Sequence, residues 1–182
     1  MKMLLSAVLY LALTVGANAA DLATLNALRA GDMKKLNFHS EPVEVSQQVF
    51  TDRGGAEFTL SDWQGKIILL NFWATWCAPC RHEMPALDAL QGELGGADFE
   101  VVTLATGRNA VPGIERFFDE VEIKHLPILL DPKQAVAREM AVLGLPITVI
   151  LNREGQEIAR LRGDAEWNSD SAKAILRALI DG

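Results

Sequence analysis

The stretch "NFWATWCAPCRHEMP", residues 71–85, contains both cysteines of the chain and decides how the rest of the sequence is interpreted. Cys77 and Cys80 are separated by two residues, behind an apolar run and at the predicted start of a helix. A structural disulfide that closes so short a loop constrains the unfolded chain little, and a structural zinc site needs four ligands. The spacing therefore favours a pair that is repeatedly oxidised and reduced.

Length and composition indicate one ordinary domain. The chain has 182 residues, of which 49% are hydrophobic, enough to bury a core that does not depend on disulfides. Its formal charge is −7, and lysine and arginine never occur more than two in a row. Nucleic acid is therefore not an expected partner. We expect no cofactor and no bound metal.

The N-terminus predicts export. Lys2 is followed by an apolar stretch over residues 3–15 and then by Ala17-Asn18-Ala19, which is an A-x-A cleavage signal. The apolar stretch is shorter than the roughly 20 residues that cross a bilayer. We expect a signal peptide, residues 1–19, with a retained membrane anchor as the alternative. Export to the periplasm lets the cysteine pair be oxidised, and its reduced state then needs an electron supply.

The remaining chain alternates predicted strands with predicted helices. The pattern over 21–36 is weakly helical, and we expect Gly31-Asp32 to end this helix. The elements expected next are a β-hairpin over 43–60, a buried strand over 66–74, a helix over 78–94, a second buried strand over 99–106 and a helix over 111–121. A short strand over 126–131, a helix over 133–143 that Gly144 ends, a hairpin over 146–163, and a final helix with apolar positions from Ala172 to Ile180 complete the chain. This alternation predicts a central sheet covered by helices on both faces. The cysteines fall at the carboxyl end of the first central strand, where open α/β sheets usually have their sites.

The position of the cysteines at a helix start suggests different roles for them. The sulfur of Cys77 can lie over the N–H groups of the first turn, where the positive end of the helix dipole stabilises a thiolate. Cys80 lies three residues on and points back toward the protein. We expect Cys77 to attack a substrate disulfide and Cys80 to resolve the mixed disulfide. Haem attachment through C-x-x-C-H is excluded, because residue 81 is arginine.

The segment "LLNFWATWCAPCRHEMPAL" resembles the active-site segment of the thioredoxin superfamily, and residues 43–182 are similar to its exported branch, the TlpA/ResA-like thiol-disulfide oxidoreductases. "FTLSDWQGK", Pro85 and "GLPITVILNREGQEIARLRG" also carry the resemblance. It implies an α/β thioredoxin fold, with a central mixed β-sheet flanked by helices, an N-terminal β-hairpin, and a central strand-helix insertion between Val111 and Asp131. Residues 20–42 are then an N-terminal extension, and 43–182 are the thioredoxin-like domain.

The same resemblance implies a substrate-binding surface. Leu145-Pro146 should be the cis-proline loop that packs against the cysteines, leaving the backbone of Leu145 free to pair with an extended substrate segment. An ordinary proline at a strand start is the alternative. Trp76 is expected at the surface beside Cys77, where it contacts substrate, whereas Phe72 and Trp73 are expected in the core.

One position departs from thioredoxin itself. Thioredoxin has a buried aspartate in the strand ahead of its cysteines, where this chain has Asn71, and an amide cannot accept and return a proton. In the TlpA/ResA-like branch, a glutamate three residues after the second cysteine takes part in the thiol chemistry, and here that residue is Glu83. Glu83 is either the proton acceptor for Cys80, on the same helix face, or a solvated helix glutamate.

The resemblance implies an enzyme, an exported disulfide reductase that acts on cysteine pairs of partner proteins. The implied partners are the haem-binding thiols of apocytochrome c or the thiols of copper sites in cytochrome oxidase, with electrons from a membrane thiol relay. A disulfide-forming oxidant is disfavoured, because such proteins usually carry a histidine where this chain has Ala78-Pro79. A copper-binding assembly factor using Cys77, Cys80 and a histidine such as His125 is also disfavoured, because the corresponding family spaces its cysteines by three residues.

Overall fold

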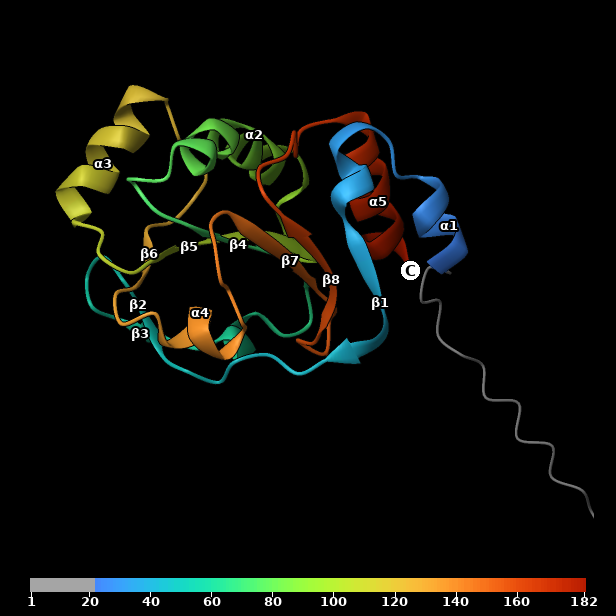
Figure 1. Ribbon diagram of the computed structural model, residues 1–182, viewed down its shortest axis with the longest axis horizontal. Helices are drawn as coiled ribbons and strands as arrows, with labels where there is room; N and C mark the ends of the chain where they lie inside the picture. The colour runs from blue at the N-terminus through green and yellow to red at the C-terminus, as the bar shows by residue number, and fades with distance from the viewer. Residues whose placement is uncertain (1–21) are drawn as a thin grey trace, which may run out of the picture.

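The computed structural model describes residues 22–182. Their strands form one sheet, and their helices pack against it (Figure 1). The predicted signal peptide, residues 1–19, and its cleavage site lie outside this range. From residue 22 to residue 182, no helix is both long enough and apolar enough to cross a membrane.

The sheet has eight strands within the described range. In chain order they are β1 (Asn37–Val43), β2 (Phe50–Asp52), β3 (Glu57–Phe58), β4 (Ile67–Trp73), β5 (Phe99–Thr106), β6 (Leu129–Asp131), β7 (Ile147–Leu151) and β8 (Glu157–Arg162). In space the order is β1-β8-β7-β4-β5-β6-β2-β3. Strands β4, β5 and β6 run parallel, whereas the strands on either side of them pair antiparallel. The sheet is therefore mixed, as predicted.

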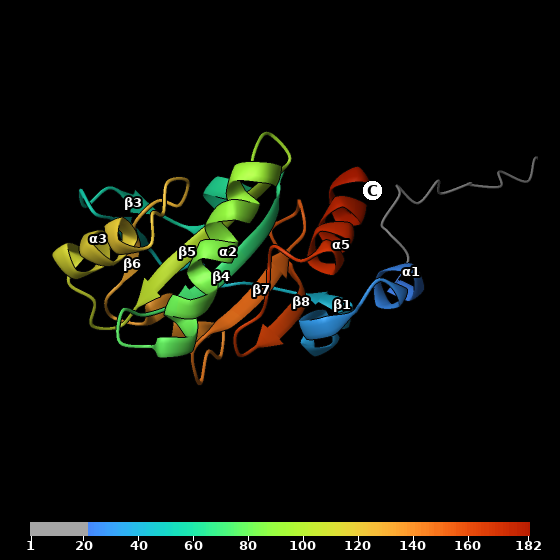
Figure 2. The ribbon, with the colours of Figure 1, turned by 90° about the horizontal axis from the view of Figure 1, so that it is seen from above.

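Helices cover both faces of the sheet. They are α1 (Leu22–Ala27), α2 (Ala78–Leu94), α3 (Val111–Glu120), α4 (Ala135–Glu139) and α5 (Asp170–Asp181), with 3₁₀ turns at Gly31–Lys35 and Leu60–Trp63. Figure 1 shows α2, α3 and α5 on one face and α4 on the other, and Figure 2 looks down on the face that carries α2, α3 and α5. Each face has its own apolar core, and the larger one holds the buried residues of α2 and α5.

The central strand β4 joins the two cores, because each of its residues is buried. Its side chains alternate, so that Ile67, Leu69 and Trp73 lie in the core under α2, and Ile68, Leu70 and Phe72 lie in the core on the face of α4. The expectation that Phe72 and Trp73 are core residues is confirmed. A strand buried on both faces gives a rigid support for the loop that follows it.

The N-terminal part differs from the predictions. The weak helix, expected to end at Gly31-Asp32, already ends at Ala27, and Gly31, with φ = 54°, begins a separate 3₁₀ turn. The strand β1, which the sequence does not predict, pairs with β8 at the edge of the sheet. Met33 and Leu36 are fully buried in the core under α5. Part of the predicted N-terminal extension is thus packed onto the sheet.

The strand expected over 126–131 is confined to β6, and two further predicted elements are also shorter than expected. The hairpin begins at Phe50 rather than Val43. Its strand β2 pairs with β6, and its strand β3 pairs with β2 at the edge of the sheet. The helix expected over 133–143 is confined to α4, and Ala141, with φ = 52°, follows it before Gly144 is reached. The carboxylate of Asp131 accepts the N–H groups of Ala135 and Ala137 at 2.7 and 3.0 Å, which fixes the start of this short helix.

The burial of Leu36 generates a test of how the N-terminal extension contributes to the fold. Leu36→Ala removes a fully buried side chain, so we expect unfolding free energy to fall by about 2–5 kcal/mol. Leu22→Ala, at an exposed leucine of α1, is the control and should change it by less than about 0.5 kcal/mol. Urea unfolding of both variants measures the difference. Equal, small effects would show that the extension is independent of the domain.

Candidate active site

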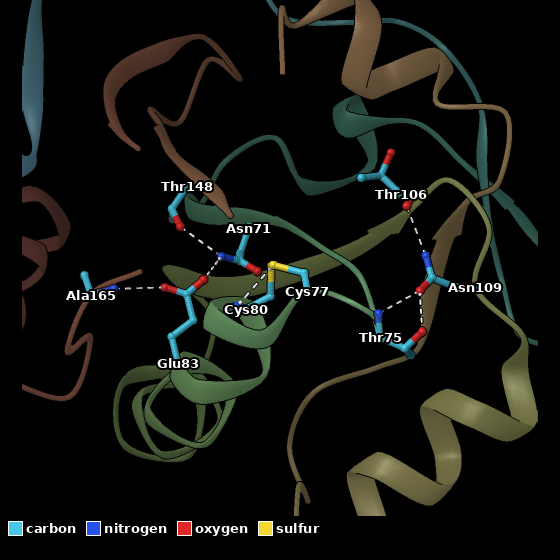
Figure 3. The surroundings of a disulfide bond; sticks show 9 residues. All are labelled: Asn71, Thr75, Cys77, Cys80, Glu83, Thr106, Asn109, Thr148 and Ala165. Atoms are coloured by element: carbon cyan, nitrogen blue, oxygen red, sulfur yellow. Dashed lines mark hydrogen bonds between the residues drawn. A yellow bond between two sulfur atoms is a disulfide. The ribbon is translucent and has the colours of Figure 1, made fainter. Parts of the chain in front are cut away.

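Cys77 and Cys80 lie at the start of α2 and form a disulfide with an S–S distance of 2.03 Å (Figure 3). Cys77 is the residue that caps α2, and its Sγ accepts a hydrogen bond from the backbone N–H of Cys80 at 3.3 Å. The predicted position of this sulfur over the first turn is confirmed. Cys77 is 6% exposed and Cys80 is 0% exposed. Of the two cysteines, Cys77 is therefore the less deeply buried.

A hydrogen-bonded asparagine holds the loop that precedes Cys77. Asn109 Oδ1 accepts hydrogen bonds from the N–H and hydroxyl of Thr75 at 2.8 and 3.0 Å. Asn109 Nδ2 in turn donates to the backbone oxygen of Thr106, the last residue of β5, at 3.0 Å (Figure 3). This link ties the loop carrying Trp76 to the neighbouring strand. Asn109 is not predicted from the sequence, because only the fold brings it to this loop.

The loop before β7 has the geometry expected from the resemblance. The peptide bond between Leu145 and Pro146 is cis. Leu145 packs against the core that contains both cysteines, and Leu143 is exposed beside a small pocket lined by Leu145 and Pro146. Trp76 is 66% exposed, as expected for a surface aromatic residue. The roles of these residues in substrate binding stay predictions.

Glu83 is buried rather than solvated. It is 2% exposed, and its Oε1 accepts a hydrogen bond from Asn71 Nδ2 at 2.7 Å (Figure 3). Its Oε2 accepts the N–H of Ala165 at 3.1 Å and the indole N–H of Trp167 at 3.2 Å. Burial raises the pKa of Glu83 to about 7, although these hydrogen bonds act to lower it. The alternative of a solvated helix glutamate is therefore wrong.

Asn71 belongs to a buried row of polar residues that crosses three strands. It is in register with Thr103 of β5 and Thr148 of β7, and none of the three is exposed. Asn71 Nδ2 also donates to Thr148 Oγ1 at 2.9 Å. Thr148 and Trp167 are not predicted from the sequence. The usable signal for Thr148 is a lone polar residue within an otherwise apolar strand.

The histidine considered for copper binding lies far from the cysteines. A Cβ atom placed on Gly92 of α2 would lie 2.9 Å from the ring of His125. Gly92 is twelve residues beyond Cys80 (92 − 80) in the same helix, or about 18 Å along its axis. Within residues 22–182, no three histidine, cysteine, aspartate or glutamate residues are grouped as a metal site requires. The geometry therefore gives no support to a copper site built on His125.

Known proteins share both the sequence pattern and the fold. Residues 30–176 match the Redoxin family. The chain is 27% identical over 128 residues to the thiol-disulfide oxidoreductase ResA of Bacillus thuringiensis. This match covers 68% of this chain and 73% of the relative. It is 33% identical over 126 residues to ResA of Geobacillus kaustophilus, and this match covers 66% of this chain and 71% of the relative. The exposed lipoprotein thioredoxin Etrx1 of Streptococcus pneumoniae superposes with a TM-score of 0.61 at 26% identity, over 75% of this chain and 100% of that one. These likenesses confirm the predicted thioredoxin fold.

The buried carboxylate predicts how stability depends on pH. Since the pKa of Glu83 rises from its ordinary 4.5 to about 7, the folded protein keeps this proton where the unfolded chain has lost it. Stability is therefore lost as pH rises through this range. Glu83→Gln removes the effect, so its unfolding free energy relative to the parent should rise with pH, by on the order of 3 kcal/mol in total.

Urea unfolding of the disulfide form at a series of pH values measures this difference. Glu120→Gln, at an exposed glutamate of α3, is the matched control for the exchange of a carboxylate for an amide. A difference between Glu83→Gln and the parent that stays constant with pH would contradict the assignment.

Proposed function

The chain belongs to the Redoxin family and is a thiol-disulfide oxidoreductase, and we propose that it works outside the cytoplasm as a reductant of cysteine pairs in partner proteins. The observation that carries this proposal is the unequal depth of the two sulfurs. Cys77, at the helix start, keeps 6% of its surface exposed, and Cys80 is fully buried behind it. Such a pair gives one nucleophile that meets the partner and one that acts only within the enzyme.

The reaction follows from this arrangement. The Cys77 thiolate attacks one sulfur of the partner's disulfide, and the partner's other sulfur leaves as a thiolate. Cys80 loses its proton to Glu83 and attacks Cys77 Sγ, so that the bond between Cys77 and the partner breaks. The partner leaves with two thiols, and the enzyme keeps the Cys77–Cys80 disulfide. Two electrons have passed from the pair to the partner.

Substrate recognition is proposed for the surface beside Cys77. The exposed ring of Trp76 offers apolar contact, and the backbone of Leu145 pairs with an extended segment of the partner by strand addition. The resemblance to the TlpA/ResA-like branch supports two classes of partner, the haem-binding thiols of apocytochrome c and the thiols of copper sites in cytochrome oxidase. A membrane thiol relay supplies the electrons that reduce the Cys77–Cys80 disulfide again.

A disulfide-forming oxidant is the second candidate, because the same pair in its disulfide state could accept electrons from a partner. Ala78 and Pro79 between the cysteines disfavour it. The two candidates require different states of the enzyme when the partner binds: a reductant attacks a partner disulfide with a free Cys77 thiolate, whereas an oxidant needs its own disulfide intact. An experiment that starts from a free Cys77 thiol therefore tests the reductant directly.

Cys80→Ser should trap the partner. Without the resolving thiol, the reduced variant attacks a disulfide through Cys77 but cannot release it, so a mixed disulfide accumulates. An oxidised peptide containing C-x-x-C-H serves as the probe, and non-reducing mass spectrometry measures the adduct. Cys77→Ser is the matched control and should trap far less. Equal trapping by the two variants would refute the division of roles.

Export predicts a defined N-terminus. Protein isolated from the native host should begin at Ala20, with the signal peptide removed between Ala19 and Ala20. The name of the pneumococcal structure, an exposed lipoprotein, supports a location outside the cytoplasm for this type of protein. Intact-mass measurement of the soluble and membrane fractions tests the prediction. Retention of Met1 in the membrane fraction would show that the segment is an anchor.

A further inference from the structure

The buried amide of Asn71 has one end without a hydrogen-bond partner. Both hydrogens of its Nδ2 are used, by Glu83 Oε1 at 2.7 Å and by Thr148 Oγ1 at 2.9 Å. Its Oδ1 is fully buried, and no donor within the described residues reaches it. Unpaired buried acceptors are rare, because a group that has lost its hydrogen bonds to water and gains none is costly. The free end of this amide therefore needs an explanation.

The free oxygen lies on the side of the cysteines. By the alternation of β4, Asn71 faces the same core as Leu69 and Trp73, and that core includes Cys80. Figure 3 shows the amide between the Glu83 carboxylate and the sulfur pair, with its nitrogen toward Glu83 and its oxygen on the sulfur side. The disulfide described here has no S–H group to offer. The reduced enzyme has one, on Cys80.

We propose that the Asn71 amide couples the protonation of Cys80 to that of Glu83: its oxygen accepts the Cys80 S–H while Glu83 is charged, and the amide turns over when the proton passes to Glu83. The inference rests on the roles of Cys77 and Cys80 proposed above, and it makes Asn71 a positioning residue for the resolving step. It also gives a role to an amide that cannot itself carry a proton.

Each orientation of the amide matches one protonation state. Before transfer, Oδ1 accepts from the Cys80 thiol and Nδ2 donates to the Glu83 carboxylate. The proton passes directly from Cys80 Sγ to the Glu83 carboxylate, which follows one turn later on the same face of α2, because the amide cannot carry it. After transfer, Nδ2 donates to the Cys80 thiolate and Oδ1 accepts from the Glu83 carboxylic acid. A half turn exchanges the two ends because they have nearly the same shape, and the Thr148 hydroxyl accepts in the first orientation and donates in the second. The thiolate then attacks Cys77 Sγ, and the partner's sulfur leaves with the electron pair.

The ionisable groups around the amide are few. Strands β4, β5 and β7 present only the uncharged row that contains Asn71, so the charge comes from α2 and from the segment after β8. On α2 these groups are the two cysteines and Glu83, whose pKa burial raises to about 7. In the segment after β8, the negative charge of Asp164 also raises the pKa of Glu83.

The resolving step can be timed with Ellman's reagent in stopped flow. The reduced enzyme releases one thionitrobenzoate when Cys77 attacks the reagent and a second when Cys80 resolves the adduct. In Asn71→Leu, which keeps the size of the side chain, the second release should slow about tenfold and move to higher pH, because the thiolate has lost a donor. The first release should change by less than about twofold.

Two threonines that flank Asn71 provide a matched pair of milder variants. Thr148→Val removes the hydroxyl that supports both orientations of the amide, and it should slow the second release by about threefold. Thr103→Val makes the same change on the other side, at a hydroxyl that has no partner within residues 22–182, and it should leave both releases unchanged. This pair decides the question even where Asn71→Leu does not fold.

A measurement on the unaltered enzyme completes the test. The side-chain ¹⁵N signal of Asn71 in the reduced protein should titrate with the same midpoint as the pH dependence of the second release. The inference would be overturned if the second release in Asn71→Leu and in Thr148→Val had the same rate and pH profile as in Thr103→Val. A first release that survives in Cys77→Ser would instead refute the roles of the cysteines, and this inference with them.

Discussion

The hydrogen bond from the backbone N–H of Cys80 to the sulfur of Cys77 is the contact on which the site depends. It forms only if α2 begins directly after Cys77, and this in turn requires β4 to end a few residues earlier. The strand is held on both faces by separate cores, and the intervening loop is tied to β5 through Asn109. A helix start fixed in this way keeps the N–H of Cys80 aimed at the sulfur of Cys77, where the positive end of the helix dipole stabilises negative charge.

The same helix start separates the two cysteines by depth. One turn of helix carries the chain from Cys77, which is 6% exposed, to the fully buried Cys80, and a further three residues bring Glu83 beside the same core. The carboxylate of Glu83 therefore comes from α2, and β4 contributes the amide of Asn71 that donates a hydrogen bond to it. Because Cys80 and Glu83 share one rigid element, their separation is set by helix geometry rather than by the docking of a helix on a sheet.

The sequence predicts the parts of the site whose signals are local. The helix over 78–94 agrees with α2 at both ends, since an apolar strand, a capping cysteine and Pro79 mark its start. The burial of Glu83 could not be predicted, because helical spacing gives direction but not depth, and the covering groups, Ala165 and Trp167, come from more than eighty residues later. Strand β1 was missed for a related reason: its mostly exposed residues lack the apolar alternation that marks a strand.

Repulsion between negative charges explains why a buried acid is useful beside two sulfurs. Two negative charges close together in a poorly solvated site repel strongly, so a thiolate at Cys77 and a charged Glu83 both oppose ionisation of Cys80. The bond of Cys77 to a partner removes the first charge, and the proton that Glu83 takes from Cys80 removes the second. Cys80 therefore becomes a nucleophile only after the mixed disulfide has formed. The groups titrate as one coupled set. This coupling imposes the order of the steps, attack by Cys77 and then resolution by Cys80. No movement larger than that of a side chain is needed.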